Sequence, residues 1–389
     1  KPINYPQPMF GLAIEPATRG QEQKLALALY NQFQSPMLRA YFSTGGRSRW
    51  HLRKVDSISG NEVPAHHWEF VIQSASEFFA NRRSNSRRRT APRFDLAILR
   101  SPNDPQPPSN DKAIKKFVPA AESVGMAAEI ITKDDYGKIA QFDGLFIRDT
   151  TYIENHTYRF ARKAEGEGLI VMDDPQSILR CTNKVYLAEL MARQGVAIPR
   201  TIVAHEGNTH EIGTTLGFPV VLKRPDSAFS QGVIKVKDQS ELETQLEKFL
   251  EDSDLVVAQE FLPTTFDWRI GVLDEQPLFA CKYFMARGHW QIINHGDNGS
   301  DHYGRFETVP VDWAPRKAVQ LAVKAAGLIG NGLYGVDVKE SNGKFYIIEV
   351  NDNPNIEAGI EDEVLKDDLY HRIMSVFLRR IEQRKSLHY

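Results

Sequence analysis

The alternation of apolar and polar positions divides the chain into three sections. Residues 1–93 mix helical spacing with short extended pieces, which predicts a small α/β unit ending in the basic run NRRSNSRRRTAPR. In residues 94–182, compact apolar strands such as FDLAILR alternate with helical stretches, which predicts a parallel, Rossmann-like sheet. In residues 183–389, helices alternate with segments predicted as antiparallel strands, among them HWQIIN at 289–294.

The last predicted hairpin brings oxygen-bearing side chains together. It spans LYGVDVKESNGKFYIIEVND, residues 333–352, with two apolar strands around a Ser-Asn-Gly turn signal. Glu349 and Asn351 are two residues apart on one strand and therefore share a face, while Asp337 lies on the partner strand.

The length of the loop decides whether Asp337 joins that face. A two-residue loop at 342–343 would set Asp337 opposite Ile348 and turn it to the wrong side. A three-residue loop at 341–343 shifts the register by one and makes Asp337 a diagonal neighbour of Glu349. The convergence of these side chains therefore requires the three-residue loop.

Two carboxylates and an amide oxygen form a hard, all-oxygen donor set that suits Mg²⁺. A metal would also give Glu349, which follows an apolar run, the partner that a buried carboxylate needs. The alternative is that these are polar groups at a solvent-facing hairpin end. On this loose pattern alone, the two interpretations weigh about equally.

Other residues of the third section suit a nucleotide. Lys223 ends the apolar strand FPVVLK beside a loop of small residues, and Lys184 opens a helix, although either lysine alone is more often a solvated end. The strand VVAQEFLP ends in backbone groups that can pair with a flat base. Asp267 and Arg269 share a strand face, where an acid can meet a ribose hydroxyl and an arginine a phosphate.

Composition narrows the classes of partner. The chain has 389 residues, 41% of them hydrophobic, and a net charge of −2, which gives no general case for nucleic acid or membrane. The two cysteines form no CxxC motif and fit a reducing, cytoplasmic location. There is no GxGxxG, no apolar run of about 18 residues, and no signal-like segment at the start.

The motifs occur in a recognisable order. The chain gives N-K, P-V-V-L-K, a small-residue loop ending in Q-G-V, Q-E-F-L, D-W-R, V-D-V and E-V-N-D-N-P. This order resembles the ATP-grasp ligases, most closely their RimK-like and glutathione synthetase-like branch, over about residues 94–385. The resemblance implies a Rossmann-like pre-ATP-grasp domain over 94–182 and an ATP-grasp fold of two α+β subdomains over 183–389.

The resemblance also implies a role for each matching position, with two lysines on the phosphates, a hinge at the adenine and an asparagine near the γ-phosphate. The implied residues are Lys184, Lys223, Ser230, Gly232, Glu260, Phe261, Leu262, Asp267 and Arg269 for the nucleotide, Asp337, Glu349 and Asn351 for the metal, Arg287 and Asn294 for catalysis, and Arg148 and Asn353 for the substrate.

The chain departs from the family at two points. Its lid segment DSAFSQG has a glycine only at Gly232, where the family often has several. Asn355 follows Pro354, where the family commonly has N-x-x-P-G beside the substrate.

The resemblance implies an ADP-forming carbon–nitrogen ligase that uses ATP and Mg²⁺, with Mn²⁺ as an alternative metal. A carboxylate becomes an acyl phosphate and an amine then displaces phosphate to form a peptide-like bond. One expected substrate is an amino acid such as glutamate, and the acceptor is left open between an amino acid, a peptide and a protein terminus. The alternatives are a phosphotransferase and a nucleotide-binding regulatory module without ligation.

The assembly and the basic run stay open at this stage. The resemblance leaves a homodimer open. The basic run before residue 94 is predicted as a solvated linker, in preference to a site for an acidic peptide or nucleic acid.

Overall fold

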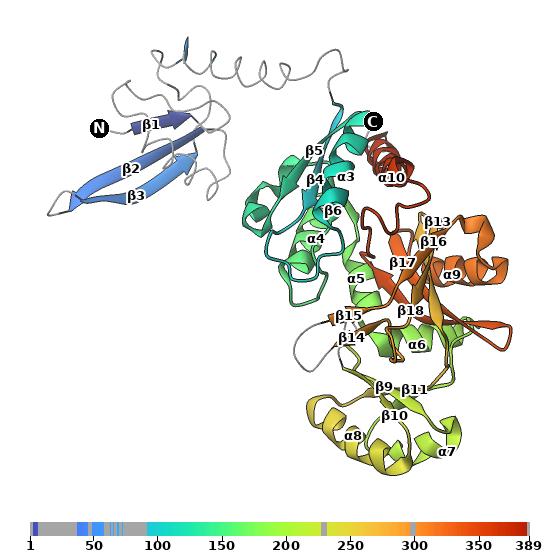
Figure 1. Cartoon of the computed structure of the whole chain (residues 1–389). Helices are drawn as coiled ribbons and strands as arrows, with labels where there is room; N and C mark the ends of the chain where they lie inside the picture. Colours follow the sequence, from blue (N-terminus) through green and yellow to red (C-terminus); the bar gives the residue numbers. More distant parts are fainter. Residues whose placement is uncertain are drawn as a thin grey trace. The chain divides into compact units, whose positions relative to one another are not determined.

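The chain separates into two compact units, residues 1–92 and residues 93–389 (Figure 1). The computed structural model describes residues 92–226, 232–295 and 301–386, and parts of the N-terminal unit, chiefly segments 3–6, 37–45 and 49–57. The N-terminal unit holds a three-stranded antiparallel sheet in the order β1-β2-β3. Its strands are β1 (Ile3–Pro6), β2 (Met37–Gly45) and β3 (Arg49–Ser57).

The stretch QEQKLALALYNQF, which has helical spacing in the predicted N-terminal unit, and most of the basic run lie outside the described residues. The division into three predicted domains stays a prediction, and the sections predicted at 94–182 and 183–389 both lie inside the second unit.

The second unit begins with a four-stranded parallel sheet in the order β5-β4-β6-β7, as predicted. Four consecutive residues, Leu96 to Leu99, are fully buried because helices cover both faces of the sheet. The strands are β4 (Phe94–Leu99), β5 (Met126–Ile131), β6 (Gly144–Ile147) and β7 (Ile170–Met172), and the helices are α3 (Asp111–Ser123), η4 (Lys133–Gln141), α4 (His156–Gly166) and α5 (Pro175–Thr182).

The C-terminal helix α10 (Asp367–Ser386) returns to this first sheet (Figure 1). The Phe117 ring of α3 meets Tyr370 of α10 edge to face, with 4.8 Å between ring centroids. Phe146 of β6 meets Phe377 in the same way at 5.5 Å. These aromatic contacts join the C-terminal end of the chain to the parallel sheet.

Two antiparallel sheets follow, in the orders β10-β9-β11-β8 and β16-β13-β12-β17-β18. The elements of the first are α6 (Lys184–Arg193), β8 (Thr201–Ala204), η5 (Thr209–Glu211), α7 (Ile212–Leu216), β9 (Val220–Lys223), β10 (Val233–Val236), α8 (Gln239–Asp252) and β11 (Val256–Glu260). Those of the second are β12 (Phe266–Leu273), β13 (Gln276–Phe284), β16 (Phe306–Val309), η6 (Val311–Trp313), α9 (Arg316–Ile329), β17 (Leu333–Ser341) and β18 (Lys344–Asp352).

The predicted strand at 289–294 is mostly wrong. Strand β14 (Ile293–His295) begins only near its end and pairs with β15 (Asp301–Tyr303). The preceding residues form a turn, in which the Gln291 carbonyl accepts from the Ala286 amide and Gly288 has a φ of 72°. A positive φ suits glycine and interrupts an extended strand.

The last hairpin has a two-residue loop, so the predicted three-residue loop is wrong. Ser341 pairs with Lys344, and Asn342 and Gly343 have φ values of 52° and 69°, the left-handed pair of a type I′ turn. A β-bulge at position 348 then shifts the register, so that Val338 faces Ile347 but Asp337 faces Glu349. The bulge brings the two carboxylates together in place of the longer loop.

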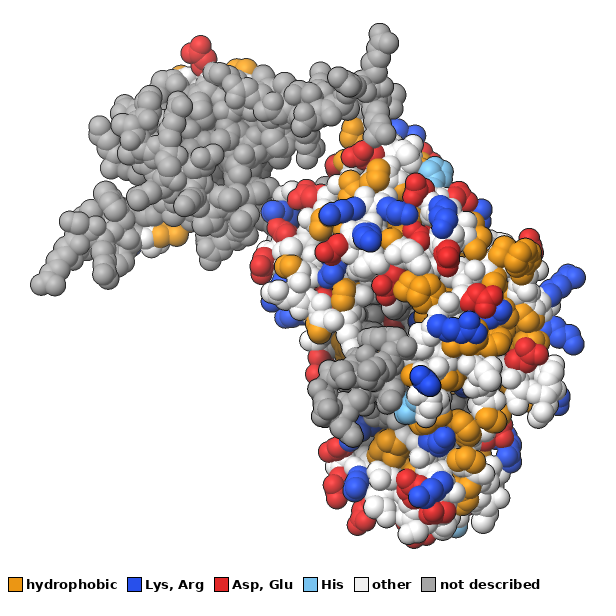
Figure 2. Space-filling view, in the orientation of Figure 1, with side chains coloured by type: hydrophobic (Ala, Val, Ile, Leu, Met, Phe, Trp, Pro, Cys, Tyr) orange, Lys and Arg blue, Asp and Glu red, His pale blue; other side chains and the backbone are white. Residues whose placement is uncertain are grey.

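Charges of both signs are interspersed on the face of the second unit shown in Figure 2. No helix of the described residues is long and apolar enough to cross a membrane. The cytoplasmic location stays a prediction.

Candidate functional site

A pocket of about 140 Å³ lies between the two antiparallel sheets. It is lined by residues from β9, β10 and β11 on one side and from β12, β17 and β18 on the other. The residues predicted from the sequence that line it are Lys184, Lys223, Glu260, Phe261, Leu262, Asp267, Asp337 and Glu349. The fold thus brings both predicted lysines, the predicted hinge and two predicted metal ligands to one cavity.

The hinge end of the pocket is held by an arginine that the sequence analysis missed. The Glu260 carboxylate accepts from Arg200 twice, from Nε at 2.7 Å and from the backbone amide at 2.8 Å. The Arg200 guanidinium also donates to the carbonyls of Thr215 and Leu216. Because Arg200 binds both oxygens of the Glu260 carboxylate and the Arg200 carbonyl accepts from the Glu260 amide at 2.9 Å, neither that carboxylate nor that amide is left for a base.

Aromatic rings line the pocket beside the hinge. The rings of Phe261 and Trp290 lie 5.9 Å apart, edge to face, and both line the cavity. The Lys235 ammonium of β10 lies over the Phe261 ring, 4.5 Å from its centroid. Rings beside the strand end at 260–262 form a surface that suits a flat, nitrogen-rich base.

The opposite end of the pocket is basic. Lys223 Nζ donates to Gln259 Oε1 at 2.9 Å, and Lys184 Nζ lies 3.6 Å from Glu349 Oε1. Burial lowers the pKa of Lys223 to about 8, with Glu349 opposing the shift and the ammonium groups of Lys184 and Lys339 adding to it. These lysines are therefore close enough to repel one another, as expected where a polyanion would bind.

The predicted metal ligands lie in the middle of β17 and near the end of β18. Asp337 faces Glu349 across the two strands, and Asn351 faces Gly335 and donates to its carbonyl at 3.4 Å. Both Asp337 oxygens accept from Arg269, at 2.7 and 2.8 Å. The three residues fit Mg²⁺, because their donors are two carboxylates and an amide oxygen, which leave further positions for water and phosphate.

Arg269 lies beside this set rather than on the wall of the cavity. Its guanidinium is engaged by Asp337 and stacks over the Tyr283 ring at 5.1 Å. The Tyr283 hydroxyl donates to the buried Glu361. In this arrangement Arg269 orients a predicted metal ligand. Only the N–H groups of Arg269 that do not bind Asp337 could contact a phosphate.

The two predicted substrate residues bind each other. Arg148 is fully buried at the end of β6, and burial lowers its pKa to about 10. It donates to Asn353 Oδ1 at 2.7 Å, to Ser109 Oγ at 3.0 Å, and to the carbonyls of Pro108 and Pro354. A substrate could reach this guanidinium only by displacing these bonds.

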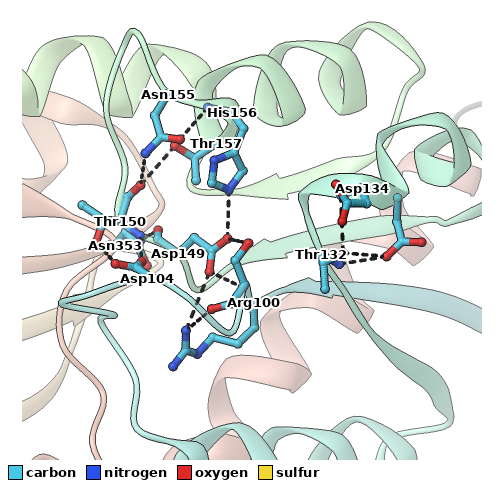
Figure 3. Close-up of polar contacts among 12 residues, drawn as sticks. Arg100, Asp104, Thr132, Asp134, Asp149, Thr150, Asn155, His156, Thr157 and Asn353 are labelled. Carbon is cyan, nitrogen blue, oxygen red and sulfur yellow. Dashed lines mark hydrogen bonds and ion pairs between the residues drawn. The ribbon is translucent and has the colours of Figure 1, made fainter.

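Asp149, which follows Arg148, organises the end of the parallel sheet (Figure 3). It accepts from the amide and hydroxyl of Ser101, both at 2.6 Å, and lies 2.9 Å from His156 Nε2. Burial would raise the pKa of Asp149, but hydrogen bonds from His156 and Ser101 hold it below its usual value. Its carbonyl accepts from Asn353 Nδ2 at 2.6 Å, so this network continues into the loop that follows the predicted metal ligands.

The remaining predicted residues lie away from this cavity or outside the described part. Arg287 is exposed and does not line the pocket. Gly232 ends the predicted lid segment with a φ of 68° and accepts from the Arg224 amide through its carbonyl. Ser230 and the side chain of Asn294 lie outside the described residues.

Comparisons with known proteins agree with this geometry. The model of the RimK-like ATP-grasp domain matches residues 181–376. A probable alpha-L-glutamate ligase from a Shewanella species is 29% identical over 228 residues, which cover 58% of this chain and 72% of that protein.

Solved structures share the fold. The D-alanine–D-alanine ligase of Bacillus anthracis complexed with ATP matches with a TM-score of 0.57 and 17% identity, over 75% of this chain and 98% of that one. A RimK domain ATP-grasp protein from Sphaerobacter thermophilus matches with a TM-score of 0.54 and 16% identity, over 72% and 98%. The predicted fold class is confirmed. Because the family model covers residues 181–376, about half of the chain, this protein belongs to the RimK-like ATP-grasp family, as the order of its motifs predicted.

Proposed function

We propose that this protein uses ATP to activate a carboxylate and joins it to an amine, with an amide, ADP and phosphate as products. Its family supports ATP-dependent carbon–nitrogen ligation, as predicted. The observation that carries the proposal is the shared cavity. Lys184 and Lys223, the hinge at 260–262 and the facing carboxylates of Asp337 and Glu349 all line it.

The first step brings together two anions, the carboxylate and the γ-phosphate, so its barrier is largely charge repulsion and alignment. The carboxylate oxygen bonds to the γ-phosphorus as the bond to the ADP oxygen breaks. In this step Lys184 and Lys223 would neutralise phosphate oxygens. Asp337, Glu349 and Asn351 would hold Mg²⁺, which when bound supplies further charge neutralisation and orients the phosphates.

In the second step the amine nitrogen attacks the acyl carbon, phosphate leaves, and the nitrogen loses a proton to water. No nucleophilic side chain is needed. The apolar walls of the cavity would exclude the water that otherwise hydrolyses an acyl phosphate.

Glutamate is the amino acid that we propose as one substrate, because relatives at 29% and 26% identity are named probable alpha-L-glutamate ligases. The other substrate is an amino acid or a peptide. It supplies the amine if glutamate supplies the carboxylate, and the carboxylate if glutamate supplies the amine. The loop after β18 that carries Asn353 and Asn355 is the part of the chain that we expect to select it, because it directly follows the metal ligands.

A phosphotransferase that stops at a phosphorylated product would use the same pocket. The test is mass spectrometry of reactions that contain the full chain, ATP, Mg²⁺ and glutamate, with a panel of amino acids and dipeptides. We expect a product with the combined mass of two substrates less one water, and one ADP for each amide. Hydroxylamine in place of the amine should trap the activated carboxylate as a hydroxamate.

A stable phosphorylated product without an amide would show a phosphotransferase instead. ATP binding without release of ADP across the panel would show a regulatory module. Either result would overturn the proposed ligase.

A further inference from the structure

Two ion pairs lie side by side on the sheet face that forms one wall of the pocket. Strand β12 contributes Asp267 and Arg269, and strand β17 contributes Asp337 and Lys339, with each pair of residues two apart. Arg269 faces Asp337, and one step along the same two strands Lys339 Nζ lies 2.7 Å from Asp267 Oδ1. The two strands therefore present alternating charges, of which the sequence analysis recognised every member except Lys339.

Lys339 belongs to the cavity and not only to the sheet. Its side chain is 13% exposed and lines the pocket together with Lys184 and Lys223. Its charge also reaches Lys223, because the Lys339 ammonium is among the groups that lower the pKa of Lys223. Three ammonium groups thus face the same cavity.

The protein accepts hydrogen bonds from the Lys339 ammonium at two positions. Thr264 Oγ1 accepts from it at 2.7 Å and Asp267 Oδ1 accepts at 2.7 Å. A lysine ammonium has three N–H donors, and among the described residues these are the two acceptors that it binds. Thr264 and Asp267 therefore fix the position of the charge and leave one N–H for a ligand.

We propose that Lys339 is a third lysine of the nucleotide site and donates to a phosphate oxygen of ATP, with Asp267 and Thr264 positioning its ammonium group. This inference rests on the proposed use of ATP. It extends the pattern predicted from the sequence, in which Lys184 and Lys223 bind the phosphates and strand β12 contributes Asp267 and Arg269.

The test compares a ligand that has phosphates with one that has none. Binding of Mg-AMPPNP and, by competition, of adenosine is measured for the full chain of the wild type, Lys339→Met and Lys339→Arg. We expect Lys339→Met to weaken AMPPNP about 10- to 100-fold, as for the loss of a charged hydrogen bond, and to leave adenosine within about twofold. Lys339→Arg should retain most of the AMPPNP affinity, because it keeps the charge.

Lys282→Met is the matched control. Lys282 lies on β13 of the same sheet, pairs with Glu307 at 3.2 Å and does not line the pocket. Its loss removes the same charge and should leave both affinities unchanged. Lys339→Gln, which keeps a donor for Asp267 but loses the charge, carries the same expectation as Lys339→Met if the methionine variant does not fold.

Wild-type affinity for AMPPNP in the variants that lack the charge would overturn the inference. An equal loss for AMPPNP and adenosine would also overturn it, because Lys339 would then only maintain the shape of the pocket. If the wild type itself failed to bind AMPPNP, the proposed function would fail as well. That outcome is read from the wild type alone, so it can be told apart from the two outcomes that concern only the Lys339 variants.

Discussion

At the scale of single residues, the site depends on how its buried charges are partnered. Asp337 is paired with Arg269, and Asp267 is paired with Lys339. Such pairing offsets part of the cost of burying carboxylates beside the proposed nucleotide site, although burial still raises the pKa of Asp267. The acids were predictable from D-W-R and V-D-V. Lys339 was not, because its pairing appears only once the two strands are in register.

Lys223 makes nucleotide affinity depend on pH. Burial lowers its pKa to about 8, and phosphate binds the protonated form, so bound nucleotide should raise that pKa again. We therefore expect the affinity for Mg-AMPPNP to be highest below about pH 8 and to fall as the pH rises above it. The measurement is the dissociation constant across about pH 6 to 10.

Lys223→Arg is the control for this prediction, because an arginine stays charged across the range. Its affinity should change less with pH than that of the wild type. If the two profiles were parallel above pH 8, Lys223 would not be the titrating group.

At the scale of elements, the hairpin β17–β18 sets the geometry of the proposed metal ligands. The sequence predicted both strands and the shared face of Glu349 and Asn351, but not the bulge at Ile348. A bulge leaves the apolar alternation on either side of it intact, so the pattern alone fits a longer loop equally well. Ile348 lines the pocket, a tertiary environment that the local pattern does not encode.

Gly335 links this hairpin to the loop after it. A Cβ at this position would lie 2.8 Å from Pro354 Cβ, and Gly335 faces Asn351. We expect Gly335→Ala to destabilise the protein by about 1–3 kcal/mol through overpacking and to raise the Mg²⁺ concentration needed for turnover. Thermal unfolding and a Mg²⁺ titration of ADP release would measure both effects.

Gly327→Ala is the comparison for that variant. Gly327 lies within α9, and its added Cβ would meet nothing within 4 Å, so alanine there should be neutral or stabilising. Equal stability of the wild type and Gly335→Ala would show that the loop at Pro354 shifts to accommodate the added Cβ without loss of stability.

At the scale of the whole molecule, the parallel sheet and the ATP-grasp part are joined by polar contacts far apart in sequence. Arg148 donates to the side chain of Asn353, which is 205 residues away in the sequence. The backbone amide of Asn353 also donates to Asp173 Oδ2 at 2.5 Å. The sequence predicted the order of the parts and the fold. It marked Arg148 for the substrate, and nothing local to Arg148 indicates that Ser109 and Pro354 surround it.

Arg148 should therefore matter for stability. Arg148→Met would leave the acceptors around it buried without donors, and we expect a loss of about 3 kcal/mol, seen as a lower midpoint of thermal unfolding. Arg148→Lys should lose less, because it keeps the charge but not the planar fork. An unchanged midpoint in Arg148→Met would contradict this structural role. The Arg148 guanidinium of the wild type would then be available to a substrate.

The central claim is that the facing carboxylates hold the metal that ligation needs. The most direct measurement is ADP and amide formation by Glu349→Ala, with Glu340→Ala, an exposed acid on the same hairpin, as the control. We expect a loss of about 10³-fold or more in Glu349→Ala, an unchanged fold, and wild-type turnover in Glu340→Ala. Turnover close to that of the wild type in Glu349→Ala would contradict it.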